Sequence, residues 1–440
     1  MAANTPDFVP QGKVELQMQL LSAAQKPIDL VRNGLTHHLE STLCETLEEI
    51  PVCYHRLHTE HVDIVDKTLK SAMVDGNPFV RWRIGFVTPQ QAQWLPWQNH
   101  QIVHYAASIH GLGEDSGHNF EMSTANILYT MNRTVKIVSR SGPVSDMVAG
   151  MAQDAGVQAV VEPTVGSYQF YQVNESDVEF ILRRLLSRAV NQKGRGQYLF
   201  YVRDNVLHFH TPDYQTQVKQ LFLYGTPWKR MAEVDRSQQL FDKGIAGTRI
   251  IVYNPYTGQS AEVVNDPAKY LRLAQGIYLM SSVPNTVQTL LYHLGTNRPD
   301  EAAAIAQNVY SDGRSRTFEM NADIDRSLLV QAGDLLQFVV SPMTQKVSPW
   351  SGYYLVSKVT HYLKLESLRT VYTLRRGEIV PDPSTVTQPN TAQQLVPVTT
   401  APGQDISLAA VQNSMQTAGA GQQQGTSNYG TVMDPNAAPD

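Results

Sequence analysis

The sequence predicts an α+β protein that is mainly β, and three observations lead to this class. Apolar and polar residues alternate over many short segments, which is the period of half-buried strands. Two segments near the middle of the chain have instead the spacing of amphipathic helices. Residues 381–440 are poor in apolar side chains and predict a disordered tail.

The first part of the chain, residues 1–140, is predicted to be a β domain. KVELQMQLL (13–21) places Val, Leu and Met at alternate positions, and NPFVRWRIGFV (77–87) alternates in the same way. HQIVHYAAS (100–108) is a third strand of this kind. This part is therefore read as mostly β.

At about residue 141 the pattern changes, and residues 141–212 are predicted to form an α+β module. SGPVSDMVAGMAQDAGV (141–157) has helical spacing, with Ser145 placed to cap its start and Gly156 its end. A strand follows that is interrupted by a turn at residues 163–166. The module thus begins with a helix and a broken strand.

The second half of the module predicts another helix and a hairpin. Ser176 and Glu179 have the spacing of a capping box, and an apolar stripe runs behind them from residue 178 to 189. YLFYVRDNVLHFH (198–210) then reads as two strands joined by a turn at Asp204 and Asn205.

Residues 213–380 are again predicted to be mainly β. The clearest strands are AGDLLQFVV (332–340), SGYYLVSKVTHYLKL (351–365) and LRTVYTLRR (368–376), which have turn residues between them. RPDEAAAIAQNVYSDG (298–313) is the predicted helix of this part.

One stretch of the C-terminal tail has a pattern of its own. In DISLAAVQNSMQ (405–416), Leu408, Val411 and Met415 lie on one face of a helix. We interpret this stretch as a possible partner-docking peptide, and the alternative is that it is disordered like the residues around it.

The charges argue against tight binding of nucleic acid. The net charge is −5, but no Lys or Arg follows Arg376, whereas five acids do. Residues 1–376 therefore hold 35 bases and, after these five are taken from 40, 35 acids. A neutral body has no basic surplus with which to neutralise phosphates.

The sequence predicts neither export nor insertion into a membrane. The N-terminal residues MAANTPDFVPQGK have no signal-peptide pattern. The longest uncharged run, 273–297, contains Pro, Asn, Gln and His, so no membrane span is expected. We expect a soluble protein that is made in the cytoplasm.

Residues 53–61, CYHRLHTEH, raise the question of a metal site. On a strand, Cys53, His55 and His61 share one face, while His58 points to the other. The spacing is not that of the usual structural zinc ligands, and we favour a polar strand face or a subunit contact. Because no metalloprotease, serine hydrolase or P-loop motif occurs either, the sequence predicts no enzyme, no catalytic residues and no cofactor.

The module carries a specific resemblance. Its two helices, its Glu-Pro-Thr turn and its final hairpin resemble the baseplate hub proteins of contractile-tailed (myovirus) bacteriophages, the tail hub or late control protein D-like family, and the closing strands are similar to the hub's last strands. The matching positions are Ser145, Asp146, Glu162, Pro163, Thr164, Gly166, Asn174, Glu175, Ser176, Asp177, Gly352, Tyr353 and Tyr354.

The resemblance implies more than the residues alone predict. It implies two tube-like β-barrel domains (1–140 and 213–380) flanking the inserted module, and a homotrimer in the baseplate of a virion tail. The implied partners are the tail tube or tube-initiator proteins, the central spike protein and other baseplate proteins. DNA would pass through the lumen without tight binding, and the role would be structural.

Two other functions stay open at this point. One is the hub part of a type VI secretion-like spike, which shares this architecture. The other is a tail-associated peptidoglycan hydrolase. On the hub interpretation, Arg183, Arg184 and Arg188 lie on the outward side of the module, available either to neighbours or to solvent.

Overall fold

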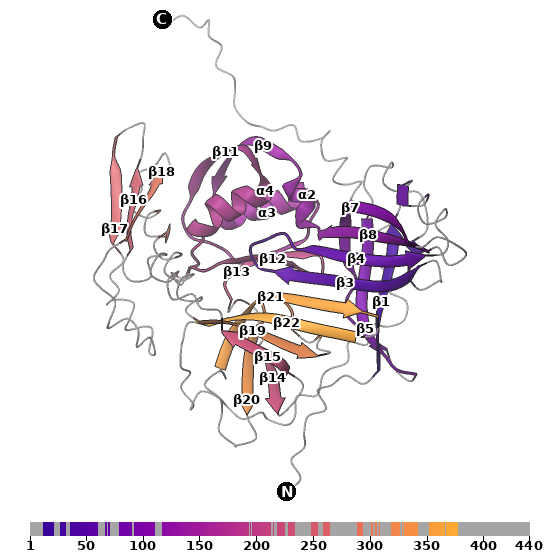
Figure 1. Ribbon diagram of the computed structural model, residues 1–440. Helices are drawn as coiled ribbons and strands as arrows, with labels where there is room; N and C mark the ends of the chain where they lie inside the picture. Colours follow the sequence, from indigo (N-terminus) through magenta and orange to yellow (C-terminus); the bar gives the residue numbers. More distant parts are fainter. Residues whose placement is uncertain are drawn as a thin grey trace, which may run out of the picture.

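The computed structural model is mainly β, as the sequence predicts, and the helices that Figure 1 labels lie together in one region. The structure describes residues 12–21, 27–31, 36–59, 67, 69–70, 79–89, 92–110, 117–192, 194, 196–212, 214, 218–224, 228–233, 248–253, 258–264, 288–293, 301, 304–305, 308, 318–325, 328, 330–341, 352–365 and 367–376. The predicted tail, 381–440, lies outside these residues.

Within the described residues, one sheet contains fourteen strands. Its main path runs β15-β19-β22-β21-β3-β4-β8-β7-β5-β1-β2, with β14 and β20 joined through β21, and β6 through β5. All three strands predicted in the first part are confirmed as β1, β5 and β7. The strands are β1 (Lys13–Leu21), β2 (Ile28–Asp29), β3 (His37–Thr46), β4 (Val52–Thr59), β5 (Phe79–Val87), β6 (Ala92–Trp94), β7 (Gln98–His110), β8 (Gly117–Asn126), β14 (Val218–Tyr224), β15 (Trp228–Glu233), β19 (Phe318–Asp325), β20 (Leu335–Ser341), β21 (Gly352–Lys364) and β22 (Ser367–Arg376).

The two β-rich parts of the chain meet in the middle of this sheet. β3 of the first part pairs antiparallel with β21 of the last part, with Thr46 opposite Lys358 and Glu40 opposite Lys364. Among the described residues the path has two ends, β15 and β2, and does not close into a barrel. The two tube-like barrels therefore remain a prediction.

Each side of the β3–β21 pair has an apolar core of its own. Alternate residues of β1, β4, β5 and β8 point into the first core, which includes Met18, Trp82, Ile84 and Phe120. Side chains of β19 to β22 fill the second core, in which Tyr354 and Tyr372 are the largest. The alternation that predicted the strands thus reflects burial on one face.

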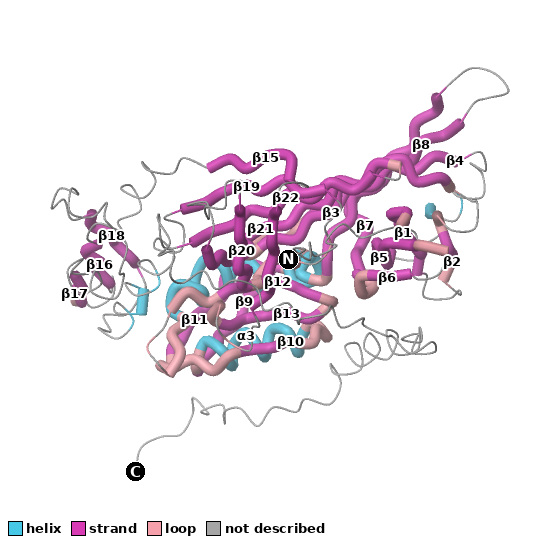
Figure 2. Tube along the Cα trace, turned by 90° about the horizontal axis from the view of Figure 1, so that it is seen from below, coloured by secondary structure: helices cyan, strands magenta, loops and turns pink. Residues whose placement is uncertain are grey.

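The module lies on one side of the long sheet, while β1, β2, β5 and β6 fold over its far end (Figures 1 and 2). It contains a ribbon of two strands, a sheet of three strands and three helical segments around one core. The module begins before the predicted boundary at residue 141, because Leu128 and Met131 of α2 lie in its core and β9 pairs with β11. Its elements are α2 (Leu128–Asn132), β9 (Val135–Gly142), α3 (Val144–Asp154), β10 (Ala159–Val161), β11 (Tyr168–Ser176), α4 (Asp177–Phe180), β12 (Leu199–Arg203) and β13 (Val206–His210). The core includes Leu128, Val144, Met147, Val148, Met151, Phe170, Val178, Phe180, Ile181, Leu185, Phe200, Leu207 and Phe209.

The second predicted helix of the module is longer than α4 alone. After α4 the chain continues as a π-helical turn (η1, Ile181–Leu185) and a short 3₁₀ turn (η2, Leu186–Arg188). The capping box of Ser176 and Glu179 is present at its start, as predicted. The hairpin β12–β13 also forms as predicted, and both turn residues, Asp204 and Asn205, have positive φ.

A separate three-stranded sheet is formed by β16 (Thr248–Tyr253), β17 (Ser260–Val264) and β18 (Gln288–His293). The described residues of the helix predicted at 298–313, namely 301, 304, 305 and 308, are helical. No helix in the described part of the chain is long and apolar enough to cross a membrane.

Candidate functional site: the junction of the three parts

The hairpin β12–β13 is the element through which the module contacts both β-rich parts. Its tip binds the first part: Gln98 donates a hydrogen bond to Asp204 Oδ1 (3.1 Å), and the backbone N–H of Asn99 donates to Asn205 Oδ1 (2.7 Å). Asn205 Nδ2 donates in turn to the carbonyl of Trp97 (2.8 Å). The turn that lets the hairpin reverse thus also attaches it to the sheet.

Residues of β12, beginning with Arg203 next to the tip, bind the last part of the chain. Arg203 forms an ion pair with Asp334 (2.9 Å), whose carboxylate is 2% exposed and also accepts the N–H of Gln331 (2.9 Å). Gly333 has φ +87°, and a Cβ at this position would lie 2.5 Å from Cζ of Tyr201. Only glycine allows the turn to pack this closely against the tyrosine ring.

A residue of the first part completes the junction. Glu45 on β3 accepts the N–H of Ala332 (3.2 Å), and burial raises the pKa of this carboxyl to about 7. Arg203, which lowers that pKa, and Asp334, which raises it, are its charged neighbours. Glu45, Arg203 and Asp334 therefore form one electrostatic group to which each part of the chain contributes a residue.

Backbone and apolar contacts support this group. The N–H of Leu47 donates to the carbonyl of Ser357 (3.0 Å), and the N–H of Glu48 donates to the carbonyl of Phe200 (2.8 Å). A small core is shared among the three parts; it consists of Leu47, Leu199, Tyr201, Ala332 and Leu355. Backbone hydrogen bonds, apolar packing and the Arg203–Asp334 ion pair thus connect the three parts at the junction.

Of the positions that match the hub motif, Ser145 and Thr164 bind each other. The N–H of Ser145 donates to Thr164 Oγ1 (2.9 Å), and the N–H of Thr164 donates to Ser145 Oγ (3.2 Å). The prediction that Ser145 caps α3 is wrong, because Pro143 is the N-cap and Ser145 lies buried in the first turn. Asp146 is exposed in that turn, where a negative charge is favourable.

The Glu-Pro-Thr turn is held by buried hydrogen bonds. Glu162 accepts the side chain of Asn191 (2.9 Å) and both the N–H (2.8 Å) and the hydroxyl (2.7 Å) of Thr211. The carbonyl of Pro163 accepts the hydroxyl of Tyr198 (3.0 Å). Gly166 closes the turn with φ +82°. These residues fix the path between β10 and β11, and their chemistry is structural.

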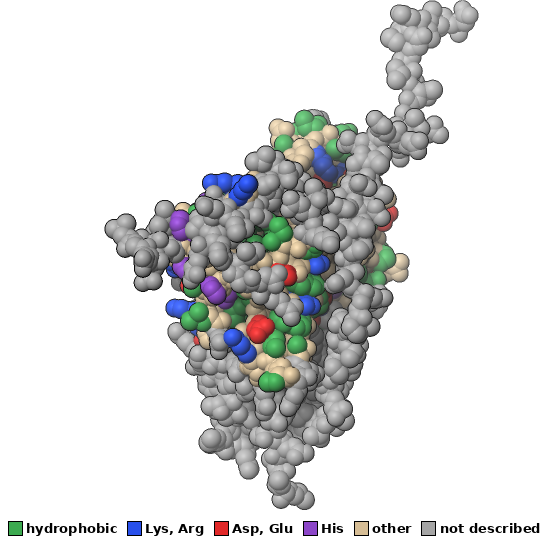
Figure 3. Space-filling model, turned by 90° about the vertical axis from the view of Figure 1, so that its right-hand side faces the viewer, with side chains coloured by type: hydrophobic (Ala, Val, Ile, Leu, Met, Phe, Trp, Pro, Cys, Tyr) green, Lys and Arg blue, Asp and Glu red, His purple; other side chains and the backbone are tan. Residues whose placement is uncertain are grey.

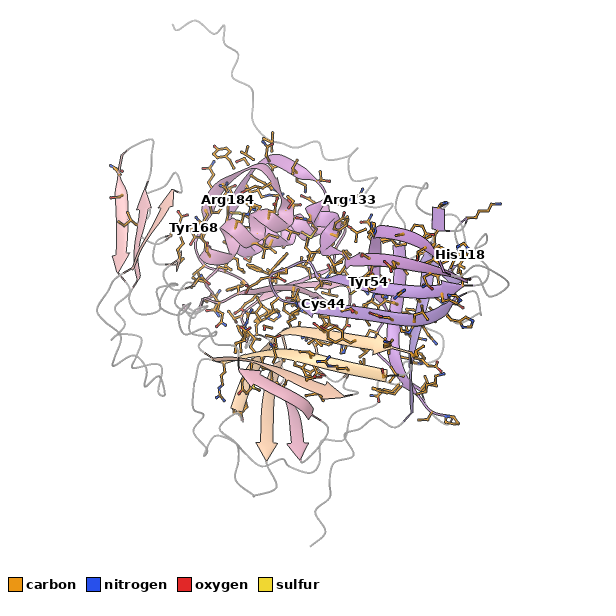
Figure 4. All side chains as sticks on the ribbon, in the orientation of Figure 1. Cys44, Tyr54, His118, Arg133, Tyr168 and Arg184 are labelled. Atoms are coloured by element: carbon orange, nitrogen blue, oxygen red, sulfur yellow. The ribbon has the colours of Figure 1, made fainter. Side chains whose placement is uncertain are left out.

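The Asn-Glu-Ser-Asp motif connects β11 to α4. Asn174, with φ +53°, forms a bulge in β11, and Ser176 caps the helix. The carboxylate of Asp177 is 2% exposed and binds Lys136 (2.6 Å) and Arg140 (3.1 Å) of β9. Glu175 pairs with Arg184 (3.0 Å), which Figure 4 labels in the module together with Tyr168.

The third stretch of the motif lies on β21. Gly352 pairs with Phe338 of β20, and Tyr354 is buried with the guanidinium of Arg376 over its ring at 5.0 Å. Tyr353, in contrast, is 46% exposed. The alternation places one tyrosine in the core and presents the other on the surface.

Arg188 corrects the prediction that three arginines face outward. Its side chain is 1% exposed and forms an ion pair with Glu301 (2.7 Å), which is equally buried. Arg183 is 67% exposed, as predicted, while Arg184 is half-exposed. Arg188 was misassigned because its partner lies 113 residues away in the sequence.

His55, one of the three residues of the candidate metal site, lies in a chain of polar contacts that crosses the four strands β3, β4, β8 and β7. Ser41 Oγ lies 2.9 Å from His55 Nδ1 and 3.0 Å from His38 Nε2. Thr124 Oγ1 lies 3.3 Å from His55 Nε2 and 3.1 Å from His100 Nδ1. Burial lowers the pKa of His38 to about 4 and that of His100 to about 3, and it lowers the pKa of His55 as well.

Both ring nitrogens of His55 are therefore within hydrogen-bond distance of hydroxyls. Cys53 is buried beside it, as the strand reading predicts, and its Sγ accepts the N–H of Cys44 (3.4 Å). The described residues contain no cluster of three His, Cys, Asp or Glu that could hold a metal ion. His61 lies outside the described residues, as do the predicted docking residues Leu408, Val411 and Met415.

Comparison with known proteins places the fold. No protein-family model matches the sequence, and no curated protein sequence matches it. A tail protein of Neisseria meningitidis MC58 is similar with a TM-score of 0.53 and 12% identity, over 82% of this chain and 96% of that chain. The 43 kDa tail protein of prophage MuSo2 from Shewanella oneidensis is similar with a TM-score of 0.54 and 10% identity, over 83% and 100%. A chain of the Francisella PdpA–VgrG complex has a TM-score of 0.49 and 9% identity, over 86% and 54%.

The chain therefore shares the fold of phage tail proteins. The likeness extends over nearly the full length of the Neisseria and Shewanella proteins. At these identities it defines the architecture of the chain and not its partners.

Proposed function

We propose that the chain is a structural protein of a contractile phage-type tail, a baseplate hub that forms a homotrimer. One observation carries the proposal: over more than four-fifths of its length the chain has the fold of proteins named as tail proteins. The hub assignment rests in addition on the motif resemblance of the module. On this proposal, the predicted ranges 1–140 and 213–380 hold the two tube-like domains, and the insertion between them is 141–212 together with α2 and the start of β9.

The sheet topology supports a doubled design. From the boundary between β21 and β3, one run of four strands (β21, β22, β19 and β15) extends in one direction, and a run of four (β3, β4, β8 and β7) extends in the other before the path continues to β5. Neighbours along this run of eight are antiparallel. Three chains would thus supply six similar four-stranded units, which is how a trimer can meet a sixfold tail tube on one face and a threefold spike on the other.

A ring of three identical chains needs two different edges on each chain. β15 pairs only with β19 among the described strands. β7 pairs with β5 only through residues 98–101, while residues 102–110 pair with β8 alone. We assign the ring contact to these two edges, so that β15 of one copy lies beside the second half of β7 in the next.

The conduit part of the proposal depends on charge. A lumen through which DNA passes must not retain it, and a wall rich in Lys and Arg would bind phosphates by releasing their counterions. The balance of 35 bases and 35 acids in residues 1–376 is compatible with a wall of this neutral kind. The contacts of Glu45, Arg203 and Asp334 at the junction hold the parts of the chain together, and this supports a structural role.

Cysteine cross-linking tests the ring. We expect His104→Cys on β7 combined with Arg230→Cys on β15 to give, after mild oxidation, linked species that end at three chains. Each single variant should stay unlinked, because a disulfide requires Cα atoms within about 7 Å.

The matched control combines His104→Cys with Tyr362→Cys, which places the second cysteine at an exposed position on the interior strand β21. Equal cross-linking of the control pair, or a ladder that continues beyond three chains, would contradict the proposed ring.

A further inference from the structure

The outward face of the ribbon formed by β9 and β11 is apolar. Ile137 is 77% exposed, Tyr171 64%, Val135 61% and Val173 50%. Ile137 lies opposite Val173 in the register, and Tyr171 lies opposite Ser139, so these side chains share one face. The remaining outward positions, Ser141 and Gln169, are also uncharged.

The cations of the ribbon serve the opposite face. Lys136 and Arg140 both bind the buried carboxylate of Asp177, which holds the ribbon on α4. The outward face therefore has no ionised side chain at any of its positions. Contiguous apolar surface of this kind marks an interaction site. In Figure 3, the top of the molecule, which is the height at which Figure 1 shows β9 and β11, presents hydrophobic and uncharged polar side chains beside a group of Lys or Arg.

We propose that this face, the ribbon surface (Val135, Ile137, Tyr171 and Val173), binds residues 405–415 of the C-terminal segment of this same chain. The proposal does not depend on the trimer, and it rests on the chemistry, the length and the starting point of that segment.

The chemistry and the dimensions of the two surfaces agree. Leu408, Val411 and Met415 follow the i, i+3, i+7 spacing of one helical face. A helix from residue 408 to 415 would place these side chains over about 10 Å. The ribbon surface extends over about 13 Å, from residue 135 to 139 on β9. A short amphipathic helix thus covers most of the ribbon surface.

The charges at the edges agree as well. Residues 377–440 contain no Lys or Arg, and Asp405 precedes the apolar stripe by three positions. Arg133, labelled in Figure 4, precedes Val135 by two positions at the start of the ribbon. We therefore place the Asp405 end of the segment toward Arg133, an arrangement that an acidic segment favours and a basic one would not.

The segment is tethered to the module through β22 and the strand beside it. β22 ends at Arg376, and the preceding Arg375 pairs with Leu355, which packs against Leu199 and Tyr201 of the module. The 32 residues from Arg376 to Leu408 have the composition of a disordered linker, whose root-mean-square span is about 30 Å. A tether of this length gives an effective concentration of the order of millimolar, so weak contacts suffice.

Hydrogen exchange on the full chain tests the proposal. We compare the wild type with the variant Leu408→Asp/Val411→Asp, which keeps the segment and removes its apolar face. The proposal predicts that amides of Val135–Gly142 exchange about tenfold more slowly in the wild type. Ile137→Asp should accelerate exchange in residues 405–415 by a similar factor.

Val52→Asp is the matched control, because Val52 is also an exposed valine (53%) on a strand, but outside the ribbon surface. It should leave exchange in both segments unchanged. Equal exchange of β9 in the wild type and the segment variant would overturn the proposal, and so would an effect of Val52→Asp as large as that of Ile137→Asp. Protection that is independent of protein concentration assigns the segment to the same copy, and protection that grows with concentration assigns it to a neighbouring copy.

Discussion

Gly333→Ala tests the contact between the hairpin and the last part of the chain. The backbone there has φ +87°, which costs an alanine about 1 kcal/mol relative to glycine. The new Cβ would in addition lie 2.5 Å from Tyr201 Cζ and 2.7 Å from its hydroxyl, and overpacking of this kind costs about 1–3 kcal/mol. We expect a total destabilisation of about 2–4 kcal/mol.

Thermal unfolding measures the loss, and Gly194→Ala separates its two sources. Gly194 has φ +71°, but nothing lies within 4 Å of an added Cβ. It should therefore lose only the backbone part, about 1 kcal/mol. Hydrogen exchange locates the effect: in Gly333→Ala, and not in Gly194→Ala, the amides of β12 should lose protection together with those of β20.

A double-mutant cycle isolates the contact with the ring. In a Tyr201→Ala background the clash is gone, so Gly333→Ala should cost only its backbone part, which gives a coupling of about 1–3 kcal/mol. If Gly333→Ala and Gly194→Ala cost the same in the wild type, or if the coupling is zero, the close packing of the turn on Tyr201 is refuted.

The remaining predictions concern charge and acid. Burial lowers the pKa of His361 to about 4, so the unfolded chain takes up this proton first and stability falls as the pH drops from about 6.5 to 4; His361→Gln should reduce that slope by up to about 1.4 kcal/mol per pH unit, and an unchanged slope would contradict the burial. Arg188→Ala leaves Glu301 buried and unpaired and should cost about 3–5 kcal/mol in denaturant unfolding, whereas Arg183→Ala on the exposed surface should cost under about 0.5 kcal/mol; equal losses would mean that Arg188 is not buried. Duplex DNA titrated into the chain at physiological salt should show no binding by fluorescence anisotropy, and salt-dependent binding would count against a neutral conduit. Metal analysis of the purified protein should find no stoichiometric zinc, and zinc that is lost in His55→Ala would revive the metal site.

Elements whose signals are local could be predicted from the sequence. The turn at Asp204 and Asn205 forms because both residues tolerate positive φ, and the capping box at Ser176 needs only a partner three residues away. The alternation in β1 and β5 also suffices to predict their buried faces. In each case the information lies within a few residues.

The junction has no such signal. Glu45, Arg203 and Asp334 come from three distant segments, and each looks like an ordinary surface charge in its own surroundings. Arg188 shows the same problem, because its position on the helix predicts exposure and a distant carboxylate reverses it. The pairing of β3 with β21 is equally non-local, so the union of the two β-rich parts in one sheet could not be predicted.

Native mass measurement of the full-length protein tests the central claim of a threefold ring most directly. The chain has a mass of 49.0 kDa, and the account predicts a species of three chains, about 147 kDa, with no larger open series. If the mass stays at that of one or two chains as the protein concentration is raised, the threefold ring is contradicted.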